Sequence, residues 1–331
     1  MEIYDLIALF AFMVAGFIAY YVYKTYFKKE GESKKRNADF TVDLTARAKA
    51  GQIEKIIGMD EVIERIIHVL SRKQKNNPLL IGEPGVGKTA AIEGLALLIA
   101  KGDVPKNLKQ VNLFSLHLGD LMAGTQYRGA LEERLKELLT KLEADKRNNI
   151  LFIDELHMIE QARGGEGALD IADILKPALS RGDLQIIGAT TWDEYQKYLK
   201  PDAAIDRRFQ PVLVEEPNKD ITKKILSGVK DEYEKFHGVC IPAETVDVAV
   251  EEAVKSIKDR FLPDKAFDVI DEACAKVAIE ASRGHGKALG LLHAASEKAK
   301  MECGGNEPIV TPQDIKEVAK QWQAHQTKPK A

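Results

Sequence analysis

The feature that most constrains the fold is a short glycine-rich stretch that ends in a lysine and a threonine. Residues 82–89 read GEPGVGKT and fit the pattern G-x-x-x-x-G-K-[ST]. The apolar run 78–81 before it predicts a buried strand, and residues 90–100 after it are apolar on a helical period. A strand, a glycine loop and a helix N-terminus in this order form a cradle for phosphate, because backbone N–H groups point inward and the helix dipole adds positive potential. An ordinary glycine turn after a strand is the alternative.

The cradle predicts binding of a nucleoside triphosphate with Mg²⁺, and ATP is the nucleotide implied by the family resemblance described below. Lys88 would reach the β- and γ-phosphates, and the hydroxyl of Thr89 would ligate Mg²⁺. The loop residues predicted to contact the nucleotide are Gly82, Glu83, Pro84, Gly85, Val86, Gly87, Lys88, Thr89 and Ala90.

Composition excludes several other classes. The chain has 331 residues and a net charge of −3, so it can hold two domains and has no basic excess that would point to nucleic acid. The cysteines, Cys240, Cys274 and Cys303, are widely spaced, which predicts reduced thiols packed as small apolar groups rather than a disulfide framework or a zinc site. No metal is expected beyond nucleotide-bound Mg²⁺.

The order of apolar runs predicts an α/β fold with a second, helical domain. Strands expected at 78–81, 111–116, 149–153, 184–191 and 211–215 alternate with helices, which indicates a parallel sheet covered by helices on both faces. Beyond residue 218 only helices are expected, at 221–236, 245–257, 265–282 and 312–324. We therefore predict a large domain at 40–217, a small helical domain at 218–325 and a tail at 326–331.

The N-terminal region predicts a membrane anchor. Residues 6–23 carry no charge and would span about 27 Å as a helix, close to the thickness of a hydrocarbon core. Acidic Glu2 and Asp5 precede the run and lysines follow it, an order that argues against a signal peptide. A buried core helix is the other alternative. The positive-inside rule then places residues 1–5 outside, and the linker 24–39 and everything after it in the cytoplasm. A bacterial inner membrane is the expected location.

A second acidic strand end completes the expected site. Asp154 and Glu155 follow the apolar run 149–153. Asp154 would hold Mg²⁺, and Glu155 would orient or deprotonate the attacking water. The alternative is that the two acids only cap the following helix.

Residues 40–323 resemble the first AAA+ module of Clp-type unfoldases, the ClpA/ClpB/ClpC group. The motifs that carry this resemblance are GEPGVGKT at 82–89, QYRGALEERL at 126–135, LFIDELH at 151–157, GALDIADILKPALSRG at 167–182, IGATTWDEY at 187–195, RRFQ at 207–210 and LPDKAFDVIDEA at 262–273. The resemblance implies a P-loop AAA+ sheet sandwiched by helices, a small helical lid domain and assembly into a homo-oligomeric ring, a hexamer in that family.

The same resemblance implies roles for individual residues. Thr191 matches the residue that senses the γ-phosphate, and Arg207 and Arg208 match arginine fingers that act on the nucleotide of a neighbouring subunit. Ile56, Ile57 and Pro263 match positions that enclose the adenine base.

Tyr127, with Arg128 beside it, matches a pore loop that grips protein substrates, and residues 164–167 match a second one. An aromatic ring offers a large contact area at low entropic cost, which suits a grip on polypeptide of any sequence. A half-buried tyrosine at a domain edge is the alternative.

Several positions depart from the family pattern. Gln126 stands where a basic residue usually precedes the tyrosine, and Met59 replaces the usual arginine. The tripeptide 289–291 only superficially resembles the peptidase-docking motif, which belongs to a second module, so coupling to a Clp peptidase is not supported.

Three hypotheses for function remain open at this point: a membrane-anchored ATPase ring that threads and unfolds polypeptides, a nucleotide-switched membrane scaffold that does not thread, and a pseudo-ATPase. The third is disfavoured because the complete set of expected catalytic residues is present.

Overall fold

The computed structural model describes residues 40–122, 128–145, 148–158, 174–175, 177–179, 184–283, 297–303 and 307–326. The predicted transmembrane helix at 6–23, the linker at 24–39, Tyr127 and the second loop at 164–167 lie outside these ranges. Within the described ranges, no helix is both long and apolar enough to cross a bilayer.

A six-stranded sheet in the order β1-β3-β4-β5-β2-β6 forms the centre of the first part of the chain. Its strands are β1 (Thr41–Asp43), β2 (Asn77–Ile81), β3 (Asn112–Leu116), β4 (Asn149–Ile153), β5 (Gln185–Thr190) and β6 (Phe209–Leu213). All neighbours pair in parallel except β1, which runs antiparallel to β3. The prediction of a purely parallel sheet was therefore wrong at one edge, because a three-residue strand is too short to show a period of its own.

The last strand also begins earlier than predicted. We expected it at 211–215, whereas β6 spans Phe209–Leu213 and pairs Pro211 with Leu79. Because β6 has a single partner and lies at the edge, one side of its backbone needs no ladder bond, and a proline fits inside the strand.

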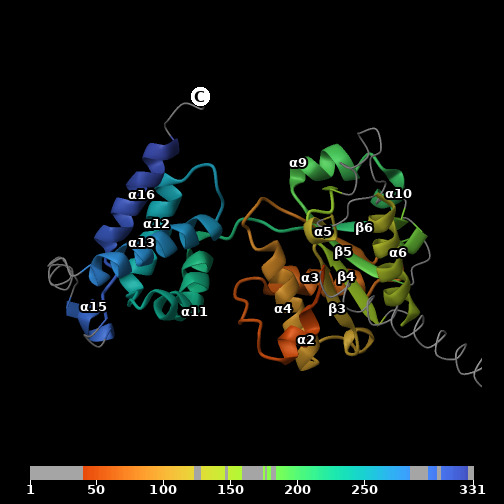
Figure 1. Ribbon diagram of the computed structural model, residues 1–331, viewed down its shortest axis with the longest axis horizontal. Coiled ribbons are helices and arrows are strands. Elements are labelled where there is room, and N and C mark those ends of the chain that lie inside the picture. The colour runs from red at the N-terminus through yellow and green to blue at the C-terminus, as the bar shows by residue number, and fades with distance from the viewer. Residues whose placement is uncertain are drawn as a thin grey trace, which may run out of the picture.

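Helices cover the sheet on both faces (Figure 1). They are α2 (Leu44–Lys49), α3 (Asp60–Leu70), α4 (Lys88–Lys101), the 3₁₀ turn η1 (Lys106–Leu108), α5 (Leu118–Met122), α6 (Arg128–Ala144), α9 (Trp192–Glu194), the π-helical turn η3 (Tyr195–Leu199) and α10 (Ala203–Asp206). These helices create two hydrophobic clusters, one on each side of the sheet.

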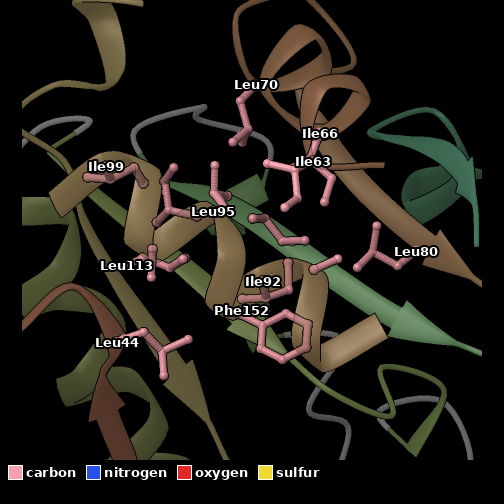
Figure 2. Close-up of a cluster of buried hydrophobic side chains, with 14 of the residues drawn as sticks. Leu44, Ile63, Ile66, Leu70, Leu80, Ile92, Leu95, Ile99, Leu113 and Phe152 are labelled. Carbon is pink, nitrogen blue, oxygen red and sulfur yellow. The ribbon is translucent and has the colours of Figure 1, made fainter. Parts of the chain in front are cut away.

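The central strands divide their side chains between the two clusters by simple alternation. In β4, Ile150 and Phe152 pack with α3 and α4, whereas Leu151 and Ile153 pack with α6 on the other face. Figure 2 shows the first cluster, in which Ile63 of α3 and Ile92 of α4 lie over Leu80, Leu113 and Phe152. Strands buried on both faces read as continuous apolar runs, which is why the sequence identified them.

The second part of the chain is helical, with its own hydrophobic cluster. Its helices are α11 (Lys219–His237), α12 (Ala243–Ser256), α13 (Asp264–Ser282), α15 (Glu297–Glu302) and α16 (Pro312–Gln326). The last helix was expected at 312–324, and Thr311 caps its start: the backbone N–H of Thr311 donates to Asp314 Oδ2 at 3.0 Å, and its hydroxyl donates to the same oxygen at 2.6 Å.

The prediction of three reduced cysteines was wrong for two of them. Cys240 and Cys303 form a disulfide, with Cα atoms 5.8 Å apart across a sequence separation of 63 residues. Cys240 follows α11 and pairs in a β-bridge with Ile309, and Cys303 follows α15. Only the folded chain brings them together. Cys274 is free and buried in α13, where burial raises the pKa of its thiol to about 12.

The chain passes from the sheet to the helical part at residues 214–218 (Figure 1). Glu216 in this crossing accepts a hydrogen bond from the backbone N–H of Leu262 at 2.7 Å and pairs with the buried Lys265 at 3.5 Å. The crossing is thus tied to the start of α13, and the two parts of the chain face one another across a cleft.

Candidate active site

The glycine loop lies at the carboxyl end of β2 and leads directly into α4. Gly87 is the N-cap of α4 with φ 100°, a left-handed conformation that favours glycine. A Cβ at Gly82 would lie 2.3 Å from the carbonyl oxygen of Val214, so the backbone there leaves no room for a side chain. The loop therefore brings N–H groups and the N-terminus of a helix to one point, as anion binding requires.

Lys88 closes over this loop. Its Nζ donates hydrogen bonds to the carbonyl oxygens of Gly82 and Glu83 at 2.8 and 2.9 Å. Burial lowers the pKa of Lys88 from its ordinary value, and the carboxylates of Asp154 and Glu194 oppose that shift. The ammonium group is held where phosphate oxygens could take over from the two carbonyls.

The predicted Mg²⁺ ligands meet at the junction of α4 and β4. Thr89 Oγ1 donates to Asp154 Oδ2 at 3.2 Å, and Asp154 Oδ1 accepts the backbone N–H of Glu155 at 2.9 Å. Hydroxyl and carboxylate oxygens suit Mg²⁺, which usually binds one or two protein groups and completes its shell with phosphate and water. In the described part of the chain, no group of three or more His, Cys, Asp or Glu residues could hold a metal ion. The ion expected here would therefore depend on the nucleotide for the rest of its ligands.

Glu155 lies beside this pair, exposed and with a φ of 49°. Non-glycine residues seldom adopt such a conformation, and the surrounding structure has to maintain it. The next backbone N–H, of Leu156, donates to Ala189 of β5 at 2.9 Å, so the turn that carries Glu155 remains attached to the sheet.

Thr191 immediately follows β5 and is the N-cap of α9. Its hydroxyl accepts the backbone N–H of Glu194 at 3.3 Å and donates to the carboxylate of the same residue at 2.8 Å. Burial raises the pKa of Glu194, but hydrogen bonds from Thr191 and the charge of His157 outweigh this effect, so that the pKa is lowered overall. Glu194 remains ionised at neutral pH.

The cleft between the two parts of the chain has a volume of about 810 Å³. Its lining includes the following predicted site residues: Ile56, Ile57, Pro84, Gly85, Gly87, Lys88, Thr89, Ala90, Asp154, Glu155, Thr191 and Pro263. Gly82, Glu83 and Val86 do not line it, and Val86 is buried in the hydrophobic cluster on the α4 side of the sheet.

Lys55 and Asp264, which belong to the two stretches expected to enclose the base, also line the cleft. Prediction from the sequence missed the other lining residues: Met59, Leu116, His117, Leu118, Gly119, His157, Thr190, Glu194, Ile225, Val229 and Phe267. The apolar faces of α11 and α13 could have indicated Ile225, Val229 and Phe267. Which face of each helix meets the loop depends, however, on how the helical part packs against the sheet. Met59 is buried, and a Cβ on Gly87 would come within 2.5 Å of its Cε. Met59 therefore supports the loop by packing. The resemblance described in the sequence analysis would have placed an arginine at this position.

Arg207 and Arg208 lie away from this cleft. Both are exposed and directly precede β6, whose first residue, Phe209, pairs with the first residue of β2. The glycine loop follows the last residue of β2, about 13 Å further along the strand. Among the described residues, neither arginine takes part in a salt bridge. Tyr127 is outside the described residues, and Arg128 is the first residue of α6.

Comparison with protein families gives two matches. Residues 78–214 match the ATPase family associated with various cellular activities (AAA), and residues 218–307 match the AAA lid domain.

Curated relatives share about half of the aligned residues. The chaperone protein ClpB of Bacteroides thetaiotaomicron is 52% identical over 241 residues, which make up 73% of this chain and 28% of that protein. The ATP-dependent Clp protease ATP-binding subunit ClpC of Staphylococcus epidermidis is 50% identical over 257 residues, or 76% of this chain and 31% of that protein. The chain thus spans less than a third of the length of these relatives.

Among solved structures, Hsp104 in its closed state with ATPγS and FITC casein has a TM-score of 0.73 at 40% identity, covering 86% of this chain and 46% of that one. The ADP complex of Hsp104 from S. cerevisiae also has a TM-score of 0.73, at 39% identity, covering 88% of this chain and 45% of that one. The chain therefore belongs to the AAA ATPases, with Clp-type ATPases as its relatives.

Proposed function

We propose that this chain is one subunit of a membrane-anchored ring that uses ATP hydrolysis to unfold or remodel proteins by threading them through a central pore. The observation that carries the ring is the separation of Arg207 and Arg208 from the glycine loop of the same chain. Exposed guanidinium groups at the opposite end of β2 would reach a nucleotide only in a neighbouring copy, where they would stabilise charge in the transition state.

Within one site, the described residues divide the work of hydrolysis. Lys88 and the N-terminus of α4 would bind the phosphates, and Thr89 and Asp154 would hold Mg²⁺, which draws charge from the γ-phosphate. Glu155 would take the proton of a water that attacks the γ-phosphorus while the bond to the β-phosphate oxygen breaks, and Thr191 would align that water. Products are ADP and inorganic phosphate.

Protein as the substrate is supported by the relatives and by Tyr127. ClpB is named as a chaperone, and Hsp104 has been solved with casein. Tyr127 directly precedes α6, and Arg128 is the first residue of that helix. These two residues are proposed to grip the polypeptide. The apolar run 6–23 supports attachment to a membrane with the ATPase module on the cytoplasmic side.

The ring can be tested by mixing two inactive variants. Lys88→Ala removes the phosphate contact, and Arg207→Ala with Arg208→Ala removes the fingers. In mixed assemblies, an intact loop of one subunit would meet the intact arginines of another, so ATPase activity should reappear on mixing. If the mixture stays as inactive as its components, the arginines act within their own chain or not at all.

Threading can be tested separately with Tyr127→Ala. We expect ATP hydrolysis to continue near the wild-type rate while unfolding of a fluorescent protein substrate stops, with Tyr127→Phe as the control that keeps the aromatic ring. If unfolding or remodelling is unchanged in Tyr127→Ala, the nucleotide-switched scaffold becomes the better account.

A further inference from the structure

Glu194 collects four polar contacts on a single carboxylate oxygen. Its Oε2 accepts the backbone N–H and the hydroxyl of Thr191 at 3.1 and 2.8 Å, and the hydroxyl of Thr190 at 3.3 Å. The same oxygen lies 3.0 Å from Nδ1 of His157. One side chain thus connects residues from two separate strand ends.

Those two strand ends carry the groups proposed to act on the attacking water. His157 follows β4 and comes two residues after Glu155, whereas Thr190 and Thr191 lie at the end of β5. His157 is buried, and its ring stacks on Tyr198 of η3 with the ring centroids 6.3 Å apart. The position of the histidine is therefore fixed from two sides, by Glu194 and by Tyr198.

Capping alone does not account for this arrangement. A capping box needs only the reciprocal bonds between Thr191 and Glu194, and the helix that it starts, α9, has three residues. The contacts to His157 and Thr190 lie outside the box. Through Glu194, these two contacts join the turn that carries Glu155 to Thr190, the residue next to Thr191. The φ of Glu155 is 49°, a conformation that its surroundings have to maintain.

We propose that Glu194 is a positioning residue for ATP hydrolysis, which holds Thr191 directly and the turn of Glu155 through His157, so that both sides of the water site stay in register. The proposal rests on the roles proposed above for Glu155 and Thr191. It does not depend on threading or on the membrane.

The chain contains a matched control. Asp314 forms the same kind of reciprocal cap with Thr311 at the start of α16, in the helical part and away from the cleft. Asp314→Asn disturbs a capping carboxylate without touching the site. Glu194→Ala removes all four contacts, and Glu194→Gln keeps one oxygen that can accept from Thr191.

The experiment measures kcat, nucleotide affinity and thermal stability for each variant. For Glu194→Ala we expect kcat to fall about tenfold to a hundredfold, since small misplacements of reacting groups cost that much, with the Kd for ATPγS within about twofold of wild type. The kcat of Glu194→Gln should lie between those of wild type and Glu194→Ala. Asp314→Asn should lose stability and keep the wild-type kcat. In a double variant with His157→Ala, the loss of kcat should be smaller than the product of the two single losses, because the two residues share the contact between Glu194 and His157.

Two results would overturn the proposal. A wild-type kcat in Glu194→Ala, with a loss of stability like that of Asp314→Asn, would reduce Glu194 to a helix cap. Loss of ATPγS binding in both Glu194 variants would make it a binding residue. A wild-type rate in Glu155→Gln would instead contradict the proposed catalytic roles, whatever the Glu194 variants do.

Discussion

At the scale of single residues, the loop depends on positions where the backbone leaves no space. Gly82 faces the carbonyl of Val214, and Gly87 begins α4 in a left-handed conformation, with the Met59 side chain where a Cβ would be. These close approaches hold β2, β6 and α4 together around the phosphate cradle. The motif therefore reflects packing as much as chemistry.

Gly82→Ala should lower the free energy of unfolding by about 1–3 kcal/mol, because the new methyl group would have to displace the Val214 carbonyl. Urea denaturation followed by circular dichroism measures the change. Gly119→Ala is the control, since a Cβ there meets nothing within 4 Å. Equal stabilities for the two variants would contradict the close packing at Gly82.

At the scale of elements, a pair of carboxyl groups connects the segment after α2 to the helix α11. Glu54 and Glu232 face one another across the boundary between the two parts of the chain. The hydrogen bond with Glu54, then burial and the charge of Glu54, raise the pKa of Glu232 to about 7, with Asp231 adding to the shift and Lys235 opposing it.

Because the folded state holds this proton more tightly than the unfolded state, its contribution to stability is complete below about pH 4.5 and is lost as the pH rises through about 7. The melting temperature of wild type should therefore decline over this window more than that of Glu54→Gln, in which the shared proton is no longer needed. Glu133 is an exposed carboxylate of α6, and the melting temperature of the control variant Glu133→Gln should change with pH as that of wild type does. If the melting temperatures of wild type and Glu54→Gln change with pH in parallel, the pair of Glu54 and Glu232 does not contribute to the pH dependence of stability.

The disulfide acts at the same scale, by tying the segment after α11 to the end of α15. Replacing both cysteines, Cys240→Ser with Cys303→Ser, should destabilise the oxidised protein by about 2–4 kcal/mol, since a cross-link over 63 residues restricts the unfolded chain. Reductant should lower the stability of wild type to that of the variant and leave the variant unchanged. If reductant has no effect on wild type, the bond is absent in the isolated protein.

At the scale of the whole molecule, the cleft is formed by two parts that approach from opposite sides. The glycine loop, Asp154 and Thr191 come from the sheet, whereas Ile225, Pro263 and Phe267 come from the helical part. A nucleotide in this cleft would therefore touch both parts of the chain. Glu216, bound to Leu262 and Lys265, ties the crossing between the two parts to the start of α13.

The proposed anchor adds a further part to this assembly. The chain of residues 1–331 should remain in membranes after carbonate washing, and a variant without residues 1–39 should be released. Val14→Arg with Ala15→Arg should also release it, because each arginine at the centre of a membrane helix costs about 2.5–3.5 kcal/mol. Extraction of the chain of residues 1–331 by carbonate would contradict a spanning helix.

The cradle, the buried strands and the acidic pair after β4 could be predicted from the sequence alone, since each depends on local spacing or on an apolar run with its own period. The errors of prediction also have local causes. The strand β1 is too short to show a period, and Pro211 led us to place the start of the edge strand β6 two residues too late.

Which distant residues come into contact could be seen only in the folded chain. It paired Cys240 with Cys303, set Met59 against Gly87, and placed Glu194 against both His157 and Thr190. Such contacts depend on how strand ends and helices pack in three dimensions, and no one-dimensional spacing encodes that packing directly.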